Sequence, residues 1–148
     1  MGKHRSYKRF IGYSTAFRQW KADSHCSTIH GYAFCFKVWF EGELDDKGWV
    51  IDFGCFKRNG VKEWMKNMFD HTTCVSADDP ELELFEEMDK RGIIDLRVFE
   101  DGVGCEKFAQ YVANYLHEIV QKETDGRVSV YKVQCWEQED NMAECYIL

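Results

Sequence analysis

The chain has 148 residues, of which 45% are hydrophobic and 16% aromatic, and it carries a net charge of −7. This length and composition exclude intrinsic disorder and fit a single domain, residues 1–148, with a hydrophobic core. The acidic balance argues against nonspecific binding to nucleic acid. The longest apolar run, around residues 31–40, is too short to span a membrane. No signal-peptide pattern follows the basic first residues, so we expect a cytoplasmic protein.

Two strands are predicted in the first third of the chain. Residues 7–20 are rich in Tyr, Phe, Ile and Thr, which favour strands. Residues 32–40 alternate strictly between large apolar and other side chains, the period of a strand with one buried face. A turn over residues 43–48 then leads into the apolar residues 49–53.

Helices and further strands are predicted in the rest of the chain. Apolar side chains recur at helical spacing over residues 56–69 and again over residues 106–120. Asp79-Pro80 is a typical helix start and Gly92 a typical helix end, which predicts a short acidic helix between them. The remaining strands are expected over residues 93–99, 128–137 and 143–147. The order ββα(α)(β)αββ indicates an α+β fold, an antiparallel sheet with helices packed on one face.

The cysteines are expected to be reduced thiols. There are seven of them, an odd number, and the chain contains no CxxC motif. Cys35 and Cys135 lie in apolar alternating segments, where a thiol usually serves as a small core residue. Cys26 alone lies in a loop beside histidines, which makes it the candidate for chemistry.

The N-terminal segment is basic. Residues 1–22 contain six lysines and arginines and no acid. Cations on an exposed strand edge can prevent sheets from pairing edge to edge, which is one interpretation. The other is a cationic rim that binds a phosphorylated ligand.

Cys26 and His30 lie in the loop that leads into the second predicted strand. Residues two apart on a strand point the same way, so His30 and Tyr32 should share the face of Phe34. A loop could fold Cys26 over the open end of that face. A thiolate near a cation or an imidazolium has a depressed pKa and can act as a nucleophile or a base.

Asp70, His71 and Glu137 are further candidates. A carboxylate next to a histidine can fix its tautomer and raise its basicity, although Asp70 could equally cap chain ends and His71 lie on the surface. Glu137 follows Trp136 at the end of a strand. It is either a solvated strand end or an anchor for a ligand with paired N–H donors.

Together these motifs resemble one family, the 6-pyruvoyltetrahydropterin and 6-carboxytetrahydropterin synthases. The resemblance spans nearly the whole chain. The compact length of the chain is more similar to that of the 6-carboxytetrahydropterin synthases of queuosine and deazapurine biosynthesis. The matching motifs, in chain order, are Phe17, Cys26-x-x-x-His30-Gly31, Val50-Ile51-Asp52-Phe53, Phe69-Asp70-His71, Glu106-x-x-Ala109, and Trp136-Glu137 with Ala143.

The resemblance implies a fold, an assembly and a reaction. The fold is the tunnelling fold, in which subunits join their sheets into a barrel, commonly as hexamers of two trimers with active sites between subunits. We therefore expect a homo-oligomer, and the aromatic residues of the second strand (Phe34, Phe36, Trp39 and Phe40) offer apolar surface for contacts between subunits. The implied reaction is a lyase step on 7,8-dihydroneopterin triphosphate, with triphosphate elimination and side-chain cleavage to 6-carboxy-5,6,7,8-tetrahydropterin.

The resemblance also assigns roles to residues. Cys26 would be the proton-transferring thiolate, with Asp70 and His71 as its partners. Glu137 would bind the pterin ring, and Glu106 would lie on the substrate side at the start of its helix.

The zinc site of the family departs most from this pattern. The family holds zinc with three histidines, one in the first strand after Phe-x-Ala-Ala and two in His-Gly-His. In this chain the second strand has His30-Gly31-Tyr32, and the segment that follows Phe17 has no histidine. His25 could serve as a substitute ligand beside His30, with Tyr32, Cys26 or water completing the shell. Alternatively Lys21, aligned with the first-strand histidine, could replace part of the zinc charge or be a solvated lysine.

Three functions remain open at this point. The first is a lyase on a dihydropterin triphosphate, and the second is a related enzyme on an altered pterin or deazapurine that needs no metal. The third is a non-catalytic pterin-binding protein with a tunnelling fold. Cys26, Asp70, His71 and Glu137 are all present, which argues against the third, because decay should not spare four separated functional positions.

Overall fold

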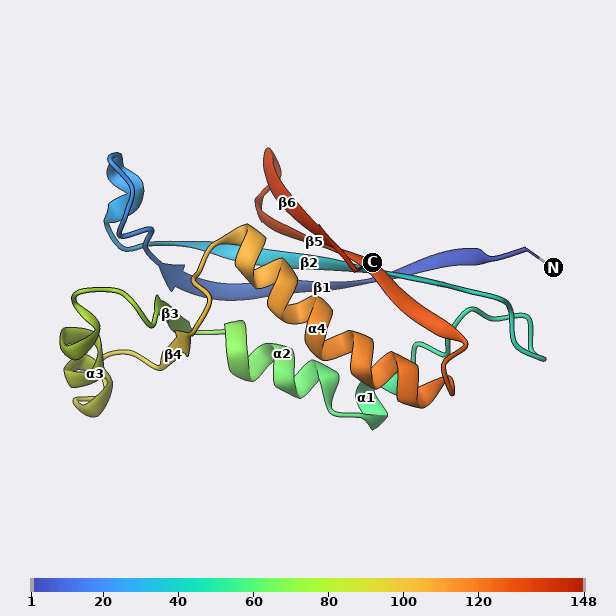
Figure 1. Ribbon diagram of the computed structural model, residues 1–148. Helices are drawn as coiled ribbons and strands as arrows, with labels where there is room; N and C mark the ends of the chain where they lie inside the picture. The colour runs from blue at the N-terminus through green and yellow to red at the C-terminus, as the bar shows by residue number, and fades with distance from the viewer. Residues whose placement is uncertain (1, 148) are drawn as a thin grey trace.

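Within residues 2–147, which the computed structural model describes, six strands form one sheet in the order β4-β3-β1-β2-β5-β6 (Figure 1). The strands are β1 (His4–Phe17), β2 (His30–Gly42), β3 (Thr72–Ser76), β4 (Leu96–Phe99), β5 (Val128–Gln138) and β6 (Asn141–Tyr146). The helices are the 3-10 turn η1 (His25–Ser27) and α1 (Cys55–Arg58), α2 (Val61–Phe69), α3 (Leu82–Lys90) and α4 (Cys105–Glu123).

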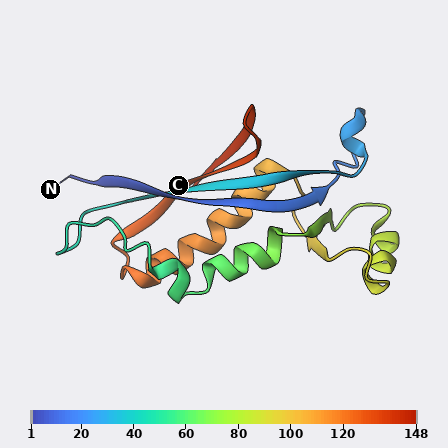
Figure 2. The same ribbon diagram turned by 180° about the vertical axis from the view of Figure 1, so that it is seen from behind.

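The sheet is mixed, which corrects the expectation of an antiparallel sheet. Strands β1, β2, β5 and β6 pair antiparallel, but β3 pairs parallel with β1 and β4 pairs parallel with β3. Strand β3 was not predicted, because all five of its residues are buried and its sequence, Thr-Thr-Cys-Val-Ser, shows no apolar alternation. Helix α3 lies in the crossover from β3 to β4, as a parallel pair requires (Figure 2).

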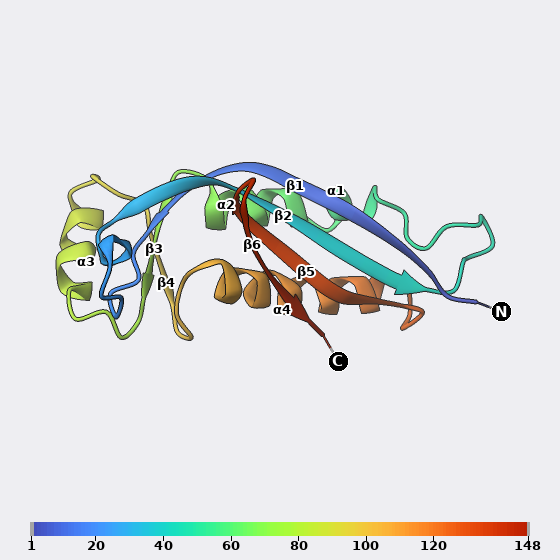
Figure 3. The same cartoon turned by 90° about the horizontal axis from the view of Figure 1, so that it is seen from above.

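The predicted buried face of the second strand is confirmed. Phe34, Phe36, Val38 and Phe40 are fully buried, and α2 and α4 cover this face of the sheet (Figure 3). The two helices pack against each other through Trp64 and Tyr115, whose rings stack 3.7 Å apart. The phenylalanines of β2 are therefore covered within one chain, and they do not supply the surface for subunit contacts that the sequence suggested.

Three predicted boundaries are wrong for identifiable reasons. The helix expected over residues 56–69 divides into α1 and α2 at Gly60, which has a φ of 69° that interrupts the helix. Helix α3 begins at Leu82 with Glu81, rather than Asp79, at its N-cap, and the Asp79 carboxylate accepts hydrogen bonds from Arg18 and from the Glu81 N–H in the turn before the helix. Strand β1 ends at Phe17, where the chain leaves the sheet, and not at Trp20 as predicted.

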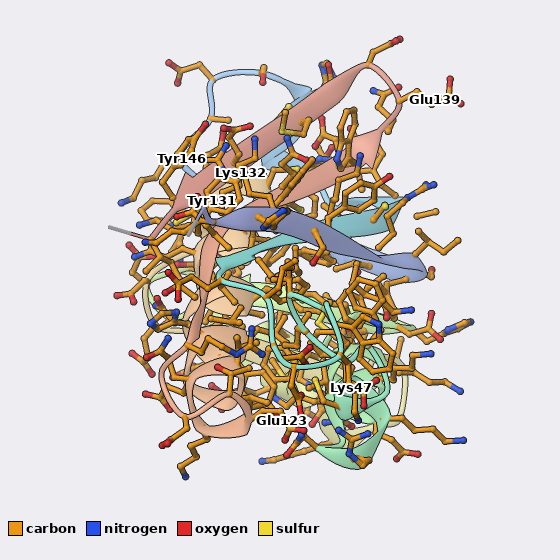
Figure 4. All side chains as sticks on the ribbon, turned by 90° about the vertical axis from the view of Figure 1, so that its right-hand side faces the viewer. Lys47, Glu123, Tyr131, Lys132, Glu139 and Tyr146 are labelled. Carbon is orange, nitrogen blue, oxygen red and sulfur yellow. The ribbon has the colours of Figure 1, made fainter. Side chains whose placement is uncertain are left out.

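The face of the sheet opposite α2 and α4 carries alternating cations and aromatic rings. Lys132 Nζ lies 5.0 Å from the ring centroid of Trp39, and Arg5 lies 4.3 Å from that of Tyr131. Figure 4 shows Tyr131, Lys132 and Tyr146 grouped on β5 and β6. No helix within residues 2–147 combines the length and the apolar character needed to cross a membrane.

Candidate active site

A cavity of about 160 Å³ lies where the end of β1 and the start of β2 meet the N-terminus of α4 and the β5–β6 hairpin. Four of the predicted site residues border it, from four different segments of the chain: Cys26, His30, Glu106 and Glu137. A thiol, an imidazole and two carboxylates thus surround one small space. This is the combination of acid, base and nucleophile that proton-transfer chemistry uses.

Cys26 is placed by the turn η1. Its N–H donates a 3.3 Å hydrogen bond to Ser24 Oγ, which caps the turn, and its carbonyl accepts from the Gln19 N–H at 2.9 Å. Arg18 reaches the carbonyl of the next residue, Ser27, at 3.4 Å. The loop that carries Cys26 is therefore held by hydrogen bonds from both sides.

His30 has a defined tautomer. Its Nδ1 lies 2.8 Å from the carbonyl oxygen of Thr28, and because a carbonyl can only accept, Nδ1 carries the hydrogen. Nε2 is left as the free ring nitrogen. Gly31 follows His30 because a Cβ there would lie 2.9 Å from the carbonyl oxygen of Thr15 on the neighbouring strand.

Glu137 lies near the end of β5, on the side of the strand that faces the helices. Asn141 Nδ2 donates to its Oε1 at 3.1 Å, and the Cys105 thiol contacts its Oε2 at 4.0 Å. Burial raises the pKa of the nearby Tyr32 phenol, and the charge of Glu137 raises it further. Glu106 lies in the first turn of α4, where the helix dipole favours a carboxylate.

Several residues at the cavity, Gln19 and Gly104 among them, were not predicted as site residues from the sequence. Gln19 Nε2 donates to the carbonyl of Val103 at 2.8 Å and forms part of the wall. Gly104 lies against it with a φ of 113°, and a Cβ at this position would come within 2.2 Å of Gln19 Nε2. Gly104, two residues before the helix predicted over residues 106–120, was the signal in the sequence for this close approach.

Asp70 and His71 lie outside this cavity in the same chain. His71 borders a different cavity, of about 670 Å³, and 84% of its side chain is exposed. Its Nδ1 lies 3.0 Å from Asp70 Oδ1, and its φ of 59° is unusual for a residue with a side chain. The Ser14 N–H, and then His71, lower the pKa of Asp70. The predicted pair is formed and oriented, but within one chain it does not meet Cys26.

Lys21 and His25 do not border the cavity of Cys26 either. Lys21 Nζ lies 3.3 Å from Asp78 Oδ2 and its side chain is 71% exposed, as expected for a solvated lysine. The residue of β1 that faces His30 is Phe17, with ring centroids 4.7 Å apart. The structure therefore places Phe17, rather than Lys21, beside the histidine of β2.

The zinc site implied by the resemblance does not fit the side chains at this place. His30, Tyr32 and Phe17 occupy the three positions, and they carry an imidazole, a phenol and a phenyl ring. The phenyl ring has no donor atom. In the part of the chain that the structure describes, no three His, Cys, Asp or Glu side chains converge as a metal site would require.

Comparisons with known proteins point to one family. The sequence model of a family described as 6-pyruvoyl tetrahydropterin synthase matches residues 7–147. The chain is 28% identical over 140 residues to the putative 6-carboxy-5,6,7,8-tetrahydropterin synthase of Pyrococcus horikoshii, covering 88% of this chain and 82% of that protein. It is also 31% identical over 75 residues to the 6-carboxy-5,6,7,8-tetrahydropterin synthase of Rickettsia conorii, which covers 50% of this chain and 54% of that protein.

Solved structures show the same fold. The uncharacterized protein WS1659 from Wolinella succinogenes superposes with a TM-score of 0.83 at 19% identity, over 99% of both chains. The 6-pyruvoyltetrahydropterin synthase of Plasmodium vivax superposes with a TM-score of 0.69 at 18% identity, over 97% of this chain and 98% of that one. The sheet and its covering helices are thus the tunnelling fold.

Proposed function

The chain belongs to the 6-pyruvoyl tetrahydropterin synthase family, and from this premise we propose that it is a lyase acting on 7,8-dihydroneopterin triphosphate, with 6-carboxy-5,6,7,8-tetrahydropterin as product. The observation that carries the proposal is the convergence of Cys26, His30, Glu106 and Glu137 on one cavity. The relative from Pyrococcus horikoshii, named for a putative activity of this kind, supports it.

Glu137 is the proposed anchor for the pterin ring. A pterin presents an amino group and a ring N–H side by side, and a carboxylate accepts both in a bidentate arrangement. The two contacts that Glu137 already makes, to Asn141 and Cys105, orient its oxygens at the cavity.

A second cavity offers a place for the triphosphate. It measures about 610 Å³ and is also bordered by Tyr32 and Glu137, so the two cavities are neighbours. Arg9 and Lys37 border it, on adjacent strands and directly opposite each other in register. Glu139 also borders this cavity, at the end away from β1 in the β5–β6 hairpin, so the two cations of the adjacent strands, rather than the cavity as a whole, are the proposed contacts for the negative charges of the ligand.

Cys26 is the proposed proton carrier, with Asp70 and His71 supplied by a second copy of the chain. The pair lies away from Cys26 within one chain, yet His71 is exposed, held by Asp70 and strained at φ 59°. Backbone strain of this kind is characteristic of functional positions. A homo-oligomer that brings His71 of one copy to Cys26 of another would complete the set.

One observation favours a second function, a pterin-binding protein or enzyme with altered specificity. Phe17 and Tyr32 lie beside His30, where the family has histidines, and a phenyl ring and a phenol there favour a different substrate or reaction. Two measurements separate the candidates: pterin binding by fluorescence titration, and turnover of 7,8-dihydroneopterin triphosphate followed by chromatography. Turnover with release of triphosphate supports the lyase. Binding without turnover supports the second function, and the absence of both contradicts each of them.

A further inference from the structure

We propose that the zinc position of the family is filled in this chain by an aromatic cluster of Phe17, His30 and Tyr32, which binds no zinc, and that two histidine substitutions would create a zinc site there. This inference goes beyond the proposed reaction and does not depend on it.

The three side chains still have the arrangement of a three-ligand site. Phe17 and His30 are register partners on β1 and β2, and Tyr32 lies two residues after His30 on the same face. The ring centroids are 4.7 Å (Phe17 to His30), 5.5 Å (His30 to Tyr32) and 6.4 Å (Phe17 to Tyr32) apart. Imidazoles bound to one tetrahedral zinc have centroids about 5 Å apart, given Zn–N bonds of ~2.0–2.1 Å. The backbone therefore presents three side chains at a separation that three zinc ligands could adopt.

Only His30 of these three offers a zinc ligand of the usual kind. Its Nδ1 is bonded to the Thr28 carbonyl, which leaves Nε2 free, as in a histidine prepared for a metal. Tyr32 offers a phenol, which is not among the usual zinc ligands, and Phe17 offers none. One imidazole does not hold zinc against water.

Phe17 belongs to the hydrophobic core rather than to a flexible wall. It is 3% exposed, and its ring lies 5.7 Å from the rings of both Phe34 and Phe108. The ring fills the space that a ligand side chain and a metal would share. The cluster is packed, and a metal could enter only if this packing were given up.

The remaining donors at the cavity do not complete a site. Cys26, Glu106 and Glu137 also border the cavity, but they lie on three separate segments, the turn η1, helix α4 and strand β5. Within residues 2–147, the His, Cys, Asp and Glu side chains form no cluster of three that could hold a metal.

The test measures zinc bound per chain by atomic emission. Wild type, Tyr32→His and the double variant Phe17→His/Tyr32→His are purified without chelator, loaded with excess zinc and freed of unbound metal by gel filtration. We expect far less than one zinc per chain in wild type and about one in the double variant. His30→Ala added to the double variant should abolish that binding, which serves as the control for the location.

Three results would overturn the inference. The first is stoichiometric zinc in wild type that His30→Ala removes, and the second is stoichiometric zinc that His71→Ala removes, which would place a site between copies. The third is a double variant that is folded by circular dichroism but binds no zinc. If Phe17→His prevents folding, the wild-type measurement still decides the first claim. Tyr32→His, tested with cobalt(II) absorption, then decides whether a second imidazole here increases metal affinity. Because no substrate is used, the result is independent of the proposed reaction.

Discussion

The guanidinium of Arg18 donates two hydrogen bonds to the carboxylate of Asp79, from Nε to Oδ2 at 2.8 Å and from Nη2 to Oδ1 at 2.6 Å. The Asp79 side chain is 1% exposed, and the same guanidinium reaches the carbonyl of Ser27. This ion pair therefore joins the segment before α3 to the loop that carries Cys26.

Asp79→Asn should destabilise the protein. The substitution leaves Arg18 without its counter-charge in a partly buried position, at an expected cost of about 2–4 kcal/mol in the free energy of unfolding. Urea denaturation at neutral pH measures this cost. Asp23→Asn, which removes an exposed carboxylate from the same loop, should change stability by less than about 0.5 kcal/mol. Equal stability of the two variants would show that the ion pair contributes little.

The same ion pair should make stability depend on pH in acid. Arg18, and then the Glu81 N–H, lower the pKa of Asp79 from its ordinary value of 3.8. A carboxyl with a depressed folded pKa contributes stability that is fully present above its unfolded pKa, and this contribution is lost as the pH falls through the folded value. The stability difference between wild type and Asp79→Asn should therefore be constant from about pH 7 to pH 5 and shrink below about pH 4. Thermal unfolding across this range checks it, and a difference that grows in acid would contradict it.

The strand alternation predicted the parts of the site that lie on regular structure. His30 and Tyr32 were expected on the helix-facing side of the second strand because they are two residues apart, and both border the cavity. Glu137 was expected at the end of its strand and lies there. Period-two patterns carry this information because the face of a strand follows from the residue number.

The sequence could not predict the positions of site residues that depend on where the chain leaves the sheet. The first strand ends at Phe17, so the following residues turn away, and Lys21 reaches Asp78 instead of the cavity. The separation of Asp70-His71 from Cys26 depends on β3, a short and uniformly buried strand without a recognisable pattern. The order of motifs along the chain does not reveal whether two of them meet within one copy.

Cys26→Ala should abolish turnover while leaving the fold intact. The thiol lies in a loop turn and contributes little to the core, so removing it should lower kcat by about 100-fold or more without changing the unfolding transition. Cys145→Ala removes a half-buried thiol on β6 that borders neither of the two proposed substrate cavities, so it is the matched control and should keep its activity. Steady-state kinetics with 7,8-dihydroneopterin triphosphate measures both. Activity that survives in Cys26→Ala would remove the thiol from the mechanism.

Glu137→Gln should weaken pterin binding more than it slows the reaction step. The amide keeps the size of the side chain but cannot accept two charge-assisted hydrogen bonds, so affinity should fall roughly 10- to 100-fold. Fluorescence titration with a pterin measures this directly. Glu118→Gln, an exposed carboxylate on α4, should bind the pterin as wild type does. Unchanged affinity in Glu137→Gln would place the pterin anchor elsewhere.

Two inactive variants should restore activity when they are mixed in one oligomer. Cys26→Ala lacks the thiol and His71→Ala lacks the imidazole, and in one chain these side chains border different cavities. If each site combines Cys26 of one copy with His71 of another, a mixed oligomer contains some sites with both intact. Random assortment of equal amounts gives about a quarter of the wild-type sites. Co-expression with two affinity tags, tandem purification and kinetics on the mixed oligomers measure the recovered activity.

The control for this complementation is a chain that carries both substitutions. Mixed with wild type, the doubly substituted chain supplies neither the thiol nor the imidazole. Activity should then come only from sites whose Cys26 and His71 both belong to wild-type chains. His71→Ala should itself be folded, because 84% of the side chain is exposed and its loss removes one contact, that with Asp70. The wild-type oligomer should be larger than a monomer by light scattering at micromolar concentration. No recovery in mixed oligomers of folded variants, or a monomer in solution, would mean that His71 of a second copy does not act on the substrate at Cys26.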